Sequence, residues 1–344
     1  MEYRTLGRTG CVVSTLALGT MTFGAETSEQ DAHAQLDRFV ELGGILIDTA
    51  DVYAAGRSEE IVGGWLASRP ADMRQRIVLA SKARFPMGAG PNDAGLSRKH
   101  LTAALDSTLR RLGSDSVDLY QVHAYDPLTP LEETLGFLDD AVHAGKVLYT
   151  GLSNFTGWQI QKTVDAADRR GLAGPVTVQP QYSLLAREIE WEIVPACLDA
   201  GLGLLPWSPL GGGWLTGKYR QDTRPAGATR LGENPERGVE AYSRRSRSER
   251  TWTVLEAVQK IAADRNASMA QISLAWLADR PAVTSVILGA RTLAQLEGNL
   301  GAAGMHLTPE ETELLNAASD PGAADYPYGL PGIEQRAREL PPRG

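Results

Sequence analysis

Four residues of this chain could together carry out proton-transfer chemistry. Asp48, Lys82 and His123 each end a short apolar run, and Tyr53 follows Asp48 by five positions. A free tyrosine has a pKa of about 10, and a lysine ammonium beside it would stabilise the phenolate and lower that pKa. Tyr53 could then act as a general acid, with Asp48 keeping Lys82 charged by pairing with it. His123 would donate a hydrogen bond to a carbonyl oxygen, so the predicted chemistry is protonation of an alkoxide.

These side chains can meet only if the apolar runs that precede them are parallel strands ending on one rim. Eight short runs have the composition of strands that are buried on both faces, and segments with helical periodicity, such as 101–112, separate them. Eight alternating units predict an α/β fold, a (β/α)8 TIM barrel, with an open doubly wound sheet as the alternative. The expected strands are 16–19, 45–48, 77–82, 117–123, 149–153, 176–179, 203–207 and 285–289.

The length of 344 residues fits a single domain, 1–344, because α/β barrels reach this size as one unit. Residues 3–14 read as an N-terminal β-hairpin that could plug the bottom of the barrel. Two segments fall outside the repeating pattern, the Arg-rich loop insertion 218–250 and the C-terminal tail 320–344. Capping-box pairs predict helix starts at Thr129, Ser268, Thr292 and Thr308.

The composition excludes several classes of protein. The 42 acidic residues outnumber the 34 basic ones and give a formal net charge of −8, which argues against nucleic acid or an anionic membrane as a partner. The chain has only two cysteines, Cys11 and Cys197, and no Cys/His cluster at metal-ligand spacing, so no metal site is expected. Without an apolar signal core or a run of roughly 18 apolar residues, the chain is expected to be soluble and cytoplasmic.

The four candidate residues and a series of further segments resemble the aldo-keto reductase superfamily. The segments LALGTMTFG, GLSNF, VQPQYSLL, WSPLGGGWLTGKY and VILGARTLAQLEGNL occur in that order, and the resemblance runs from about Tyr3 to about Asn316. WSPL and LTGKY are closer to the bacterial reductases and the potassium-channel β-subunit branch than to the vertebrate aldose reductases. The resemblance implies an NADP-dependent oxidoreductase that reduces aldehyde or ketone carbonyls to alcohols, with Asp48, Tyr53, Lys82 and His123 as its catalytic residues.

The same resemblance implies a cofactor site along the rim of the barrel. Trp207 matches the aromatic residue that stacks on the nicotinamide ring, and 208–218 matches the pyrophosphate loop. Ser153, Asn154 and Gln179 match residues that bind the nicotinamide carboxamide. The full set of implied cofactor residues is Gly19, Thr20, Met21, Asp48, Ser153, Asn154, Gln179, Trp207, Ser208, Pro209, Leu210, Gly211, Gly213, Thr216, Gly217, Lys218, Arg230, Leu288, Gly289, Ala290, Arg291, Gln295 and Asn299.

The adenosine end of this implied site favours NADPH over NADH. Arg291 offers a fork of donors just ahead of a helix that begins at Thr292, where free amides and the helix dipole also favour a 2′-phosphate. Gly298 stands where the family often has glutamate, so its effect on cofactor affinity is left open.

The substrate and its partners are the least determined part of the sequence. Met21, Phe23, Phe85 and Tyr125, with Tyr326 and Tyr328 of the tail, are expected to line the substrate pocket. One alternative is a nucleotide-bound interaction module, as the channel β-subunit resemblance permits. Another is an enoyl or keto reductase acting on a nucleotide-linked deoxysugar. The physiological substrate, the choice between C=O and C=C reduction, and the state as monomer or homo-oligomer are not decided by the sequence.

Overall fold

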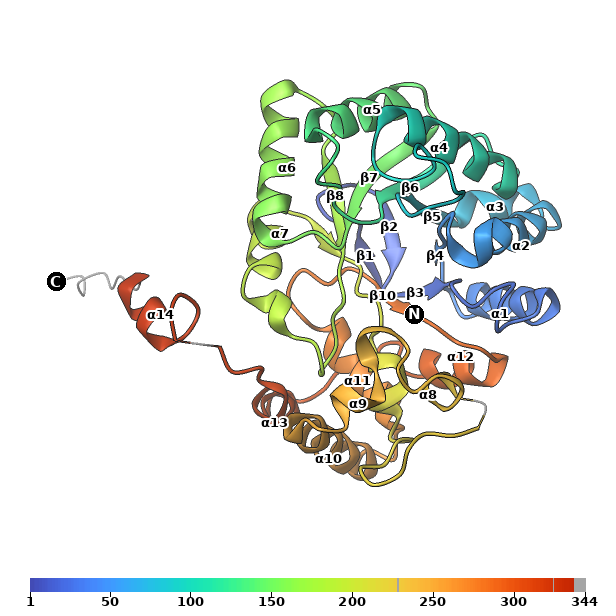
Figure 1. Ribbon diagram of the computed structural model, residues 1–344. Helices are drawn as coiled ribbons and strands as arrows, with labels where there is room; N and C mark the ends of the chain where they lie inside the picture. The colour runs from blue at the N-terminus through green and yellow to red at the C-terminus, as the bar shows by residue number, and fades with distance from the viewer. Residues whose placement is uncertain (228, 324, 337–344) are drawn as a thin grey trace.

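The eight predicted strands form one parallel sheet that curls around a common axis (Figure 1). The computed structural model describes residues 1–227, 229–323 and 325–336. Neighbouring strands follow chain order from β3 to β9, and β10 pairs with β3. The strands are β3 (Leu16–Gly19), β4 (Leu46–Asp48), β5 (Val78–Ala83), β6 (Val117–Val122), β7 (Val147–Ser153), β8 (Pro175–Gln179), β9 (Gly203–Leu204) and β10 (Val286–Leu288).

Backbone hydrogen bonds join the two ends of this sheet. The Leu204 amide donates to the Ala282 carbonyl at 2.7 Å, and the Thr284 amide donates to the Leu204 carbonyl at 2.9 Å. Farther along, the Ile287 amide donates to the Pro206 carbonyl at 3.0 Å. Since the segments around β9 and β10 meet, the sheet closes, and the predicted (β/α)8 barrel is confirmed over the open doubly wound sheet.

The seventh barrel strand, β9, is shorter than the predicted 203–207. Pro206 has no amide to donate to a ladder, which limits the regular strand. The chain nevertheless continues beside β8, because the Leu205 amide donates to the Val178 carbonyl and the Trp207 amide to the Pro180 carbonyl, both at 2.9 Å. Trp207 therefore still arrives at the carboxyl-terminal rim.

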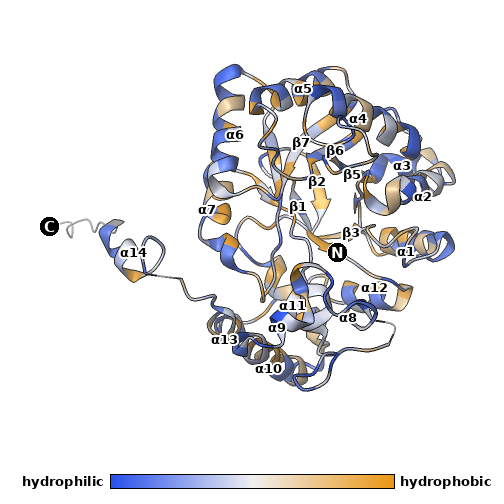
Figure 2. Ribbon diagram, viewed as in Figure 1, coloured by the Kyte–Doolittle hydropathy of each residue, from blue (hydrophilic) through white to orange (hydrophobic). Residues whose placement is uncertain are grey.

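Helices surround the strands (Figure 1), and most of their buried side chains are apolar. In Figure 2 these helices carry both hydrophilic and hydrophobic stretches, as expected for elements with one face in water and one on a core. The α-helices are α1 (Glu29–Glu41), α2 (Arg57–Ala67), α3 (Ala71–Arg76), α4 (Arg98–Leu112), α5 (Leu131–His143), α6 (Gly157–Arg170), α7 (Ile193–Ala200), α8 (Arg230–Glu233), α9 (Tyr242–Arg245), α10 (Glu249–Asp264), α11 (Met269–Ala278), α12 (Leu293–Leu300), α13 (Pro309–Ser319) and α14 (Leu330–Arg336).

A hairpin closes the end of the barrel where the strands begin. Strands β1 (Tyr3–Thr5) and β2 (Val12–Ser14) pair antiparallel, and Leu6 between them is fully buried in the barrel interior. Gly7 has φ +56°, and a Cβ there would lie 2.2 Å from the Val176 carbonyl oxygen at the start of β8. Only glycine fits so close to that backbone. The predicted hairpin is present, at the end of the barrel opposite the predicted site.

The predicted helix starts are correct in part. Ser268 and Thr308 each form the complete capping box with the residue three positions later. Thr292 caps α12, but the side chain of Gln295 turns to the Arg291 amide instead. The capping box at Thr129 is wrong, because its hydroxyl donates to Asp126 and α5 starts after Pro130.

The insertion and the tail contain short helices. The insertion 218–250 holds α8, the 3-10 helix η4 (Gly238–Glu240) and α9, and α10 begins at its end. The tail carries α14, which projects away from the barrel in Figure 1. None of the described helices combines the length and apolar composition that crossing a bilayer requires.

Candidate active site

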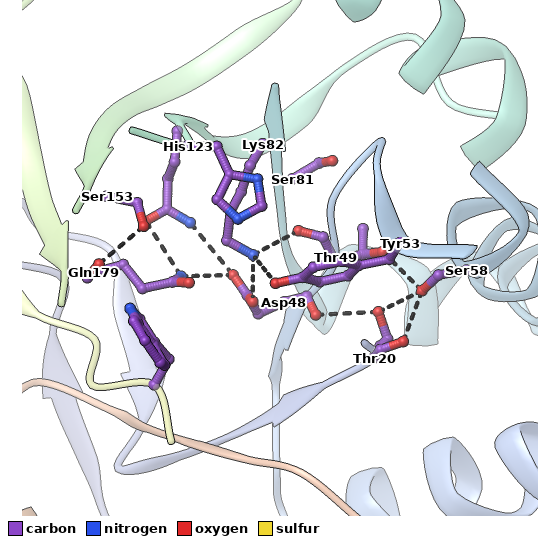
Figure 3. A network of polar contacts seen from close by, with 12 residues as sticks. Thr20, Asp48, Thr49, Tyr53, Ser58, Ser81, Lys82, His123, Ser153 and Gln179 are labelled. Carbon is purple, nitrogen blue, oxygen red and sulfur yellow. Dashed lines mark hydrogen bonds and ion pairs between the residues drawn. The ribbon is translucent and has the colours of Figure 1, made fainter. Parts of the chain in front are cut away.

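The four predicted catalytic residues converge on the carboxyl-terminal rim (Figure 3). Asp48 ends β4, Lys82 is the penultimate residue of β5, and His123 directly follows β6. Tyr53 begins the 3-10 helix η1 (Tyr53–Gly56), which follows β4. Because parallel strands end together, three consecutive strands bring all four side chains to one place.

Lys82 is the centre of this group. Its Nζ donates to Asp48 Oδ2 at 2.6 Å, to the Thr49 carbonyl at 2.8 Å and to Tyr53 Oη at 3.3 Å. The side chain is fully buried, and burial alone would lower the pKa of Lys82. Asp48 and Tyr53 outweigh this effect and raise that pKa, so the amine stays protonated.

Asp48 is held on both of its oxygens. Oδ1 accepts from Gln179 Nε2 at 2.9 Å and from Gln121 Nε2 at 3.3 Å, while Oδ2 accepts from Lys82. Three donors fix the direction of this buried carboxyl group. Gln121 is absent from the predicted set, although its position two residues before His123 places it on the same face of β6 and could have revealed it.

The phenol of Tyr53 keeps its proton at neutral pH. Burial raises the pKa of Tyr53, and the positive charge of Lys82 opposes that rise without cancelling it. The expectation that Lys82 brings this pKa below its ordinary value is therefore wrong, because desolvation of the phenolate outweighs the ammonium. A protonated phenol is the form that can donate to a reacting oxygen.

His123 is neutral and packed between aromatic rings. Its ring lies edge-on to Phe85 and Tyr53, with centroids 4.7 Å and 5.9 Å away. Burial, together with the charges of Lys82 and Arg84, lowers the pKa of His123 to about 2. Within the described residues its buried Nδ1 has no hydrogen-bond partner. A neutral imidazole can donate one hydrogen bond without adding charge to the site.

The ends of β7 and β8 bring a second group of predicted residues beside the first. Asn154 Nδ2 donates to the His123 carbonyl at 2.9 Å, and its Oδ1 accepts from Trp207 Nε1 at 3.1 Å. Ser153 Oγ donates to the Gln179 carbonyl at 2.9 Å. Asn154 has φ +55°, an uncommon conformation for a residue with a side chain. The indole of Trp207 is thus fixed in place by Asn154, next to the predicted catalytic residue His123.

A cationic region continues the site away from the barrel axis. It contains Lys218, Arg230, Arg237 and Arg291, all in or next to the predicted cofactor residues. Burial and the neighbouring arginines Arg291 and Arg230 lower the pKa of Lys218, and burial with Arg237 lowers that of Arg230. Neither Lys218 nor Arg230 has an ion-pair partner among the residues that the structure describes. This donor set fits phosphate groups, which would supply the missing negative charge.

The loop beside these cations is shaped by glycine. Residues 211–216 form the 3-10 helix η3 (Gly211–Thr216), in which Gly212 and Gly213 have φ of +65° and +98°. A Cβ on Gly213 would lie 2.6 Å from Lys218 Nζ. The loop can therefore bring its backbone amides and Lys218 close to the same ligand atoms.

Some predicted cofactor residues are covered by protein. Thr20, Leu288 and Ala290 are buried, and Thr20 donates to the Asp48 carbonyl at 3.2 Å. Asn299 is also buried, on α12. These residues shape the site from behind and can meet a ligand mainly through backbone atoms.

The predicted substrate residues separate into two groups. Phe85 lies against His123, Tyr125 packs on Phe155 and Trp158, and Met21 is 40% exposed. Phe23, by contrast, is fully buried in the core and does not belong to the wall of an open pocket, which corrects its place in the predicted set.

Of the predicted tyrosines of the tail, Tyr328 lines a groove that also contains Trp158, the residue on which Tyr125 packs. Tyr326 is 69% exposed. Tyr328 stacks on Trp191, with ring centroids 5.7 Å apart, in an outer groove between α6 and α7.

A buried acid behind Tyr53 was not predicted. Asp51 is fully buried, and its amide donates to the Lys82 carbonyl at 3.1 Å. In the described part of the chain neither of its carboxylate oxygens meets a well-aligned donor. Burial and the charge of Glu59 raise the pKa of Asp51 to about 7. Glu59 itself is paired with Arg111 at 2.7 Å.

The chain is similar to known proteins over nearly its whole length. The model of the "Aldo/keto reductase family" matches residues 15–320. The chain is 37% identical to the "Uncharacterized oxidoreductase YrpG" of Bacillus subtilis over 92% of this chain and 95% of that protein. It is 38% identical to a "Probable voltage-gated potassium channel subunit beta" of Oryza sativa, over 92% and 96%. It is 32% identical to the "L-glyceraldehyde 3-phosphate reductase" of Escherichia coli, over 93% and 96%.

Proposed function

The chain belongs to the aldo/keto reductase family, and from this premise we propose that it reduces aldehyde or ketone carbonyls to alcohols with NADPH as hydride donor. One observation carries the proposal. The buried Nζ of Lys82 contacts both Asp48 Oδ2, at 2.6 Å, and Tyr53 Oη, at 3.3 Å. An ammonium held this way against a phenol equips the phenol to give up a proton to a neighbouring oxygen.

Proton transfer in this proposal runs through Tyr53. Its phenol donates a proton to the oxygen of the reacting carbonyl as negative charge develops there. Lys82 remains charged and stabilises the phenolate that is left, while Asp48 holds the ammonium in position. His123, neutral because of its burial, directs the same oxygen toward Tyr53 with a hydrogen bond.

The cofactor is assigned to the rim from Trp207 to Arg291. Reduced nicotinamide supplies the hydride when it is bound there. Trp207 would lie against its ring, Ser153, Asn154 and Gln179 would hold its carboxamide, and the cations beside η3 would hold its phosphates. The support for this assignment is that two cations, Lys218 and Arg230, have no ion-pair partner within the described part of the site.

The decisive experiment is Tyr53→Phe. We expect NADPH binding, followed by nucleotide fluorescence, to be unchanged, while kcat/KM on a panel of aldehydes and ketones falls by several decades. Tyr149→Phe removes a hydroxyl on β7 and serves as the matched control with normal turnover. Retained carbonyl reduction in Tyr53→Phe would contradict the proposal.

A second candidate function is a nucleotide-binding interaction module. The observation that favours it is the 38% identity to a protein whose name designates a probable potassium-channel β subunit. A wild-type chain that binds NADPH tightly, yet turns over none of the carbonyls in the panel, would favour the module over the reductase. NMR of the product, asking whether C=O or C=C is reduced, separates the reductase from the enoyl alternative.

A further inference from the structure

The insertion crosses the cofactor region as a strap, defined here as residues 230–245, whose two ends are attached by different chemistry. One end is aromatic and buried. The ring of Tyr242 stacks on Trp214 at 5.6 Å, and Trp214 Nε1 donates to the Glu240 carbonyl at 3.0 Å. Arg245 Nε donates to the Glu240 carboxylate at 2.6 Å. Aromatic packing on the buried Trp214 and the buried ion pair of Glu240 with Arg245 hold this end without any added anion.

The other end of the strap is ionic. Glu233 accepts from Arg291 Nη1 at 2.9 Å and from Nη2 at 2.6 Å. Arg237 donates to Glu26 at 2.6 Å, and Glu26 also lies 3.5 Å from Arg291. The Glu233 side chain is 48% exposed, so water and solutes reach this contact.

Glu233 binds Arg291 in the way that a phosphate would. Both outer nitrogens of the guanidinium are engaged by the two oxygens of one carboxylate, which is the two-pronged geometry that arginine also offers to phosphate. A phosphate monoester at Arg291 would have to take these donors, and its negative charge would repel the carboxylate.

The surroundings favour an anion even with Glu233 in place. Four cations, Lys218, Arg230, Arg237 and Arg291, face two carboxylates, Glu26 and Glu233, which leaves an excess of two positive charges (4 − 2 = 2). Removing one carboxylate charge should therefore strengthen anion binding, most of all at the arginine that the carboxylate occupies.

We propose that Glu233 is a specificity-determining residue that competes with the 2′-phosphate of the cofactor for Arg291. The inference rests on the proposed function, because it takes the adenosine end of the cofactor to lie at Arg291. NADPH has to displace Glu233 and so detach the ionic end of the strap, whereas NADH, which lacks the 2′-phosphate, leaves that end in place. Glu233 thereby reduces the advantage of NADPH over NADH.

The test compares Kd values for NADPH, NADH and 2′,5′-ADP, which carries the phosphate but no nicotinamide. Calorimetry reports binding without any turnover. Glu233→Gln should bind NADPH and 2′,5′-ADP about fivefold more tightly, as expected for removal of one exposed ion pair, with NADH within twofold of wild type. Glu236→Gln removes the same charge three residues away in the strap and serves as the control.

Three results would overturn the inference. They are equal tightening for NADH and NADPH, an effect in Glu236→Gln as large as in Glu233→Gln, and an effect of Glu233→Gln that persists in an Arg291→Met background. Absence of 2′,5′-ADP binding by every variant would overturn it as well. A failure of the proposed function looks different, because carbonyl reduction then survives in Tyr53→Phe whatever the Kd values are.

Discussion

Two carboxylate–cation pairs of this molecule have the same length and opposite surroundings. Lys82 and Asp48 are 2.6 Å apart with side chains 0% and 3% exposed, and Arg291 and Glu233 are 2.6 Å apart with side chains 19% and 48% exposed. Losing one partner of a buried pair leaves an uncompensated charge in a low dielectric, whereas an exposed pair is replaced by water and salt. Burial, more than distance, distinguishes the pair that we propose acts on the Tyr53 proton from the pair that we propose yields to a ligand.

Lys82→Met should have the largest effect of any substitution considered. It removes the ammonium next to Tyr53, so we expect kcat/KM to fall by several decades. It also leaves Asp48 buried without its cation, so the free energy of unfolding should fall by about 3–5 kcal/mol. Urea denaturation measures this loss. Lys146→Met is the control, because it removes a half-exposed ion pair with Asp106, 2.8 Å long. Equal losses of unfolding free energy in the two variants would show that burial does not decide the effect.

Asp51→Asn tests how a buried acid makes the stability of the fold depend on pH. The pKa of Asp51 is about 7 in the fold against an ordinary 3.8, so between these pH values the folded chain keeps a proton that the unfolded chain has lost. Stability therefore falls as pH rises from about 4 to about 7 and stays low above that. The asparagine variant escapes this loss, and its gain over wild type should be larger at pH 8 than at pH 5, by up to about 3 kcal/mol, because at pH 5 only the part of the loss between pH 3.8 and pH 5 has occurred.

Urea unfolding at both pH values measures the effect of Asp51→Asn. Asp72→Asn, which makes the same change at an exposed position on α3, is the control. A difference between Asp51→Asn and wild type that is the same at pH 5 and pH 8 would contradict the assignment of this buried acid.

Arg291→Met tests how much the exposed ion pairs contribute to stability. Its pairs with Glu233 and Glu26 lie where solvent can replace them, so the free energy of unfolding should change by less than about 1 kcal/mol. Urea denaturation in low and high salt is the measurement. A loss of several kcal/mol would mean that the ionic end of the strap is a structural contact comparable to the one at Lys82.

The smallest expected effect concerns His123, which should not change its charge in the pH range of the assay. With a pKa of about 2, this residue stays neutral across the accessible range, and the pKa of Tyr53 lies above its ordinary value. The pH profile of kcat/KM should therefore show no acidic limb from the histidine between pH 5 and pH 8. A limb near pH 6.5 that disappears in His123→Gln would show that the imidazole is charged during turnover.

Buried runs explain why so much of the fold could be predicted. The barrel strands lie between neighbours on both faces, so they occur in the sequence as short, mainly apolar runs, and residues at or next to their carboxyl ends reach the site. Asp48, Lys82 and His123 were found this way. The sequence patterns failed where another interaction competed with the expected element. Pro206 shortens β9, and the Thr129 hydroxyl donates to Asp126 and does not cap a helix.

The features missed depend on what surrounds a residue in space. Nothing in the segment around Tyr53 states whether desolvation or the nearby ammonium controls its pKa, and only the packing decides that burial prevails. Phe23 and Asp51 are similar cases, since an aromatic residue in a rim loop or an acid after a strand can face either way. The contact between Glu233 and Arg291 joins positions 58 residues apart and has no local signal.

The hairpin at the amino terminus has a practical consequence. Leu6 and Gly7 seat it against the starts of the strands, on the side of the cylinder away from the reacting residues. If the chain is tethered to a sensor or resin through its first residue, the carboxyl-terminal rim of the barrel faces the solution and is accessible to small molecules. Attachment through the amino group of Met1 is therefore the orientation to choose for immobilised assays.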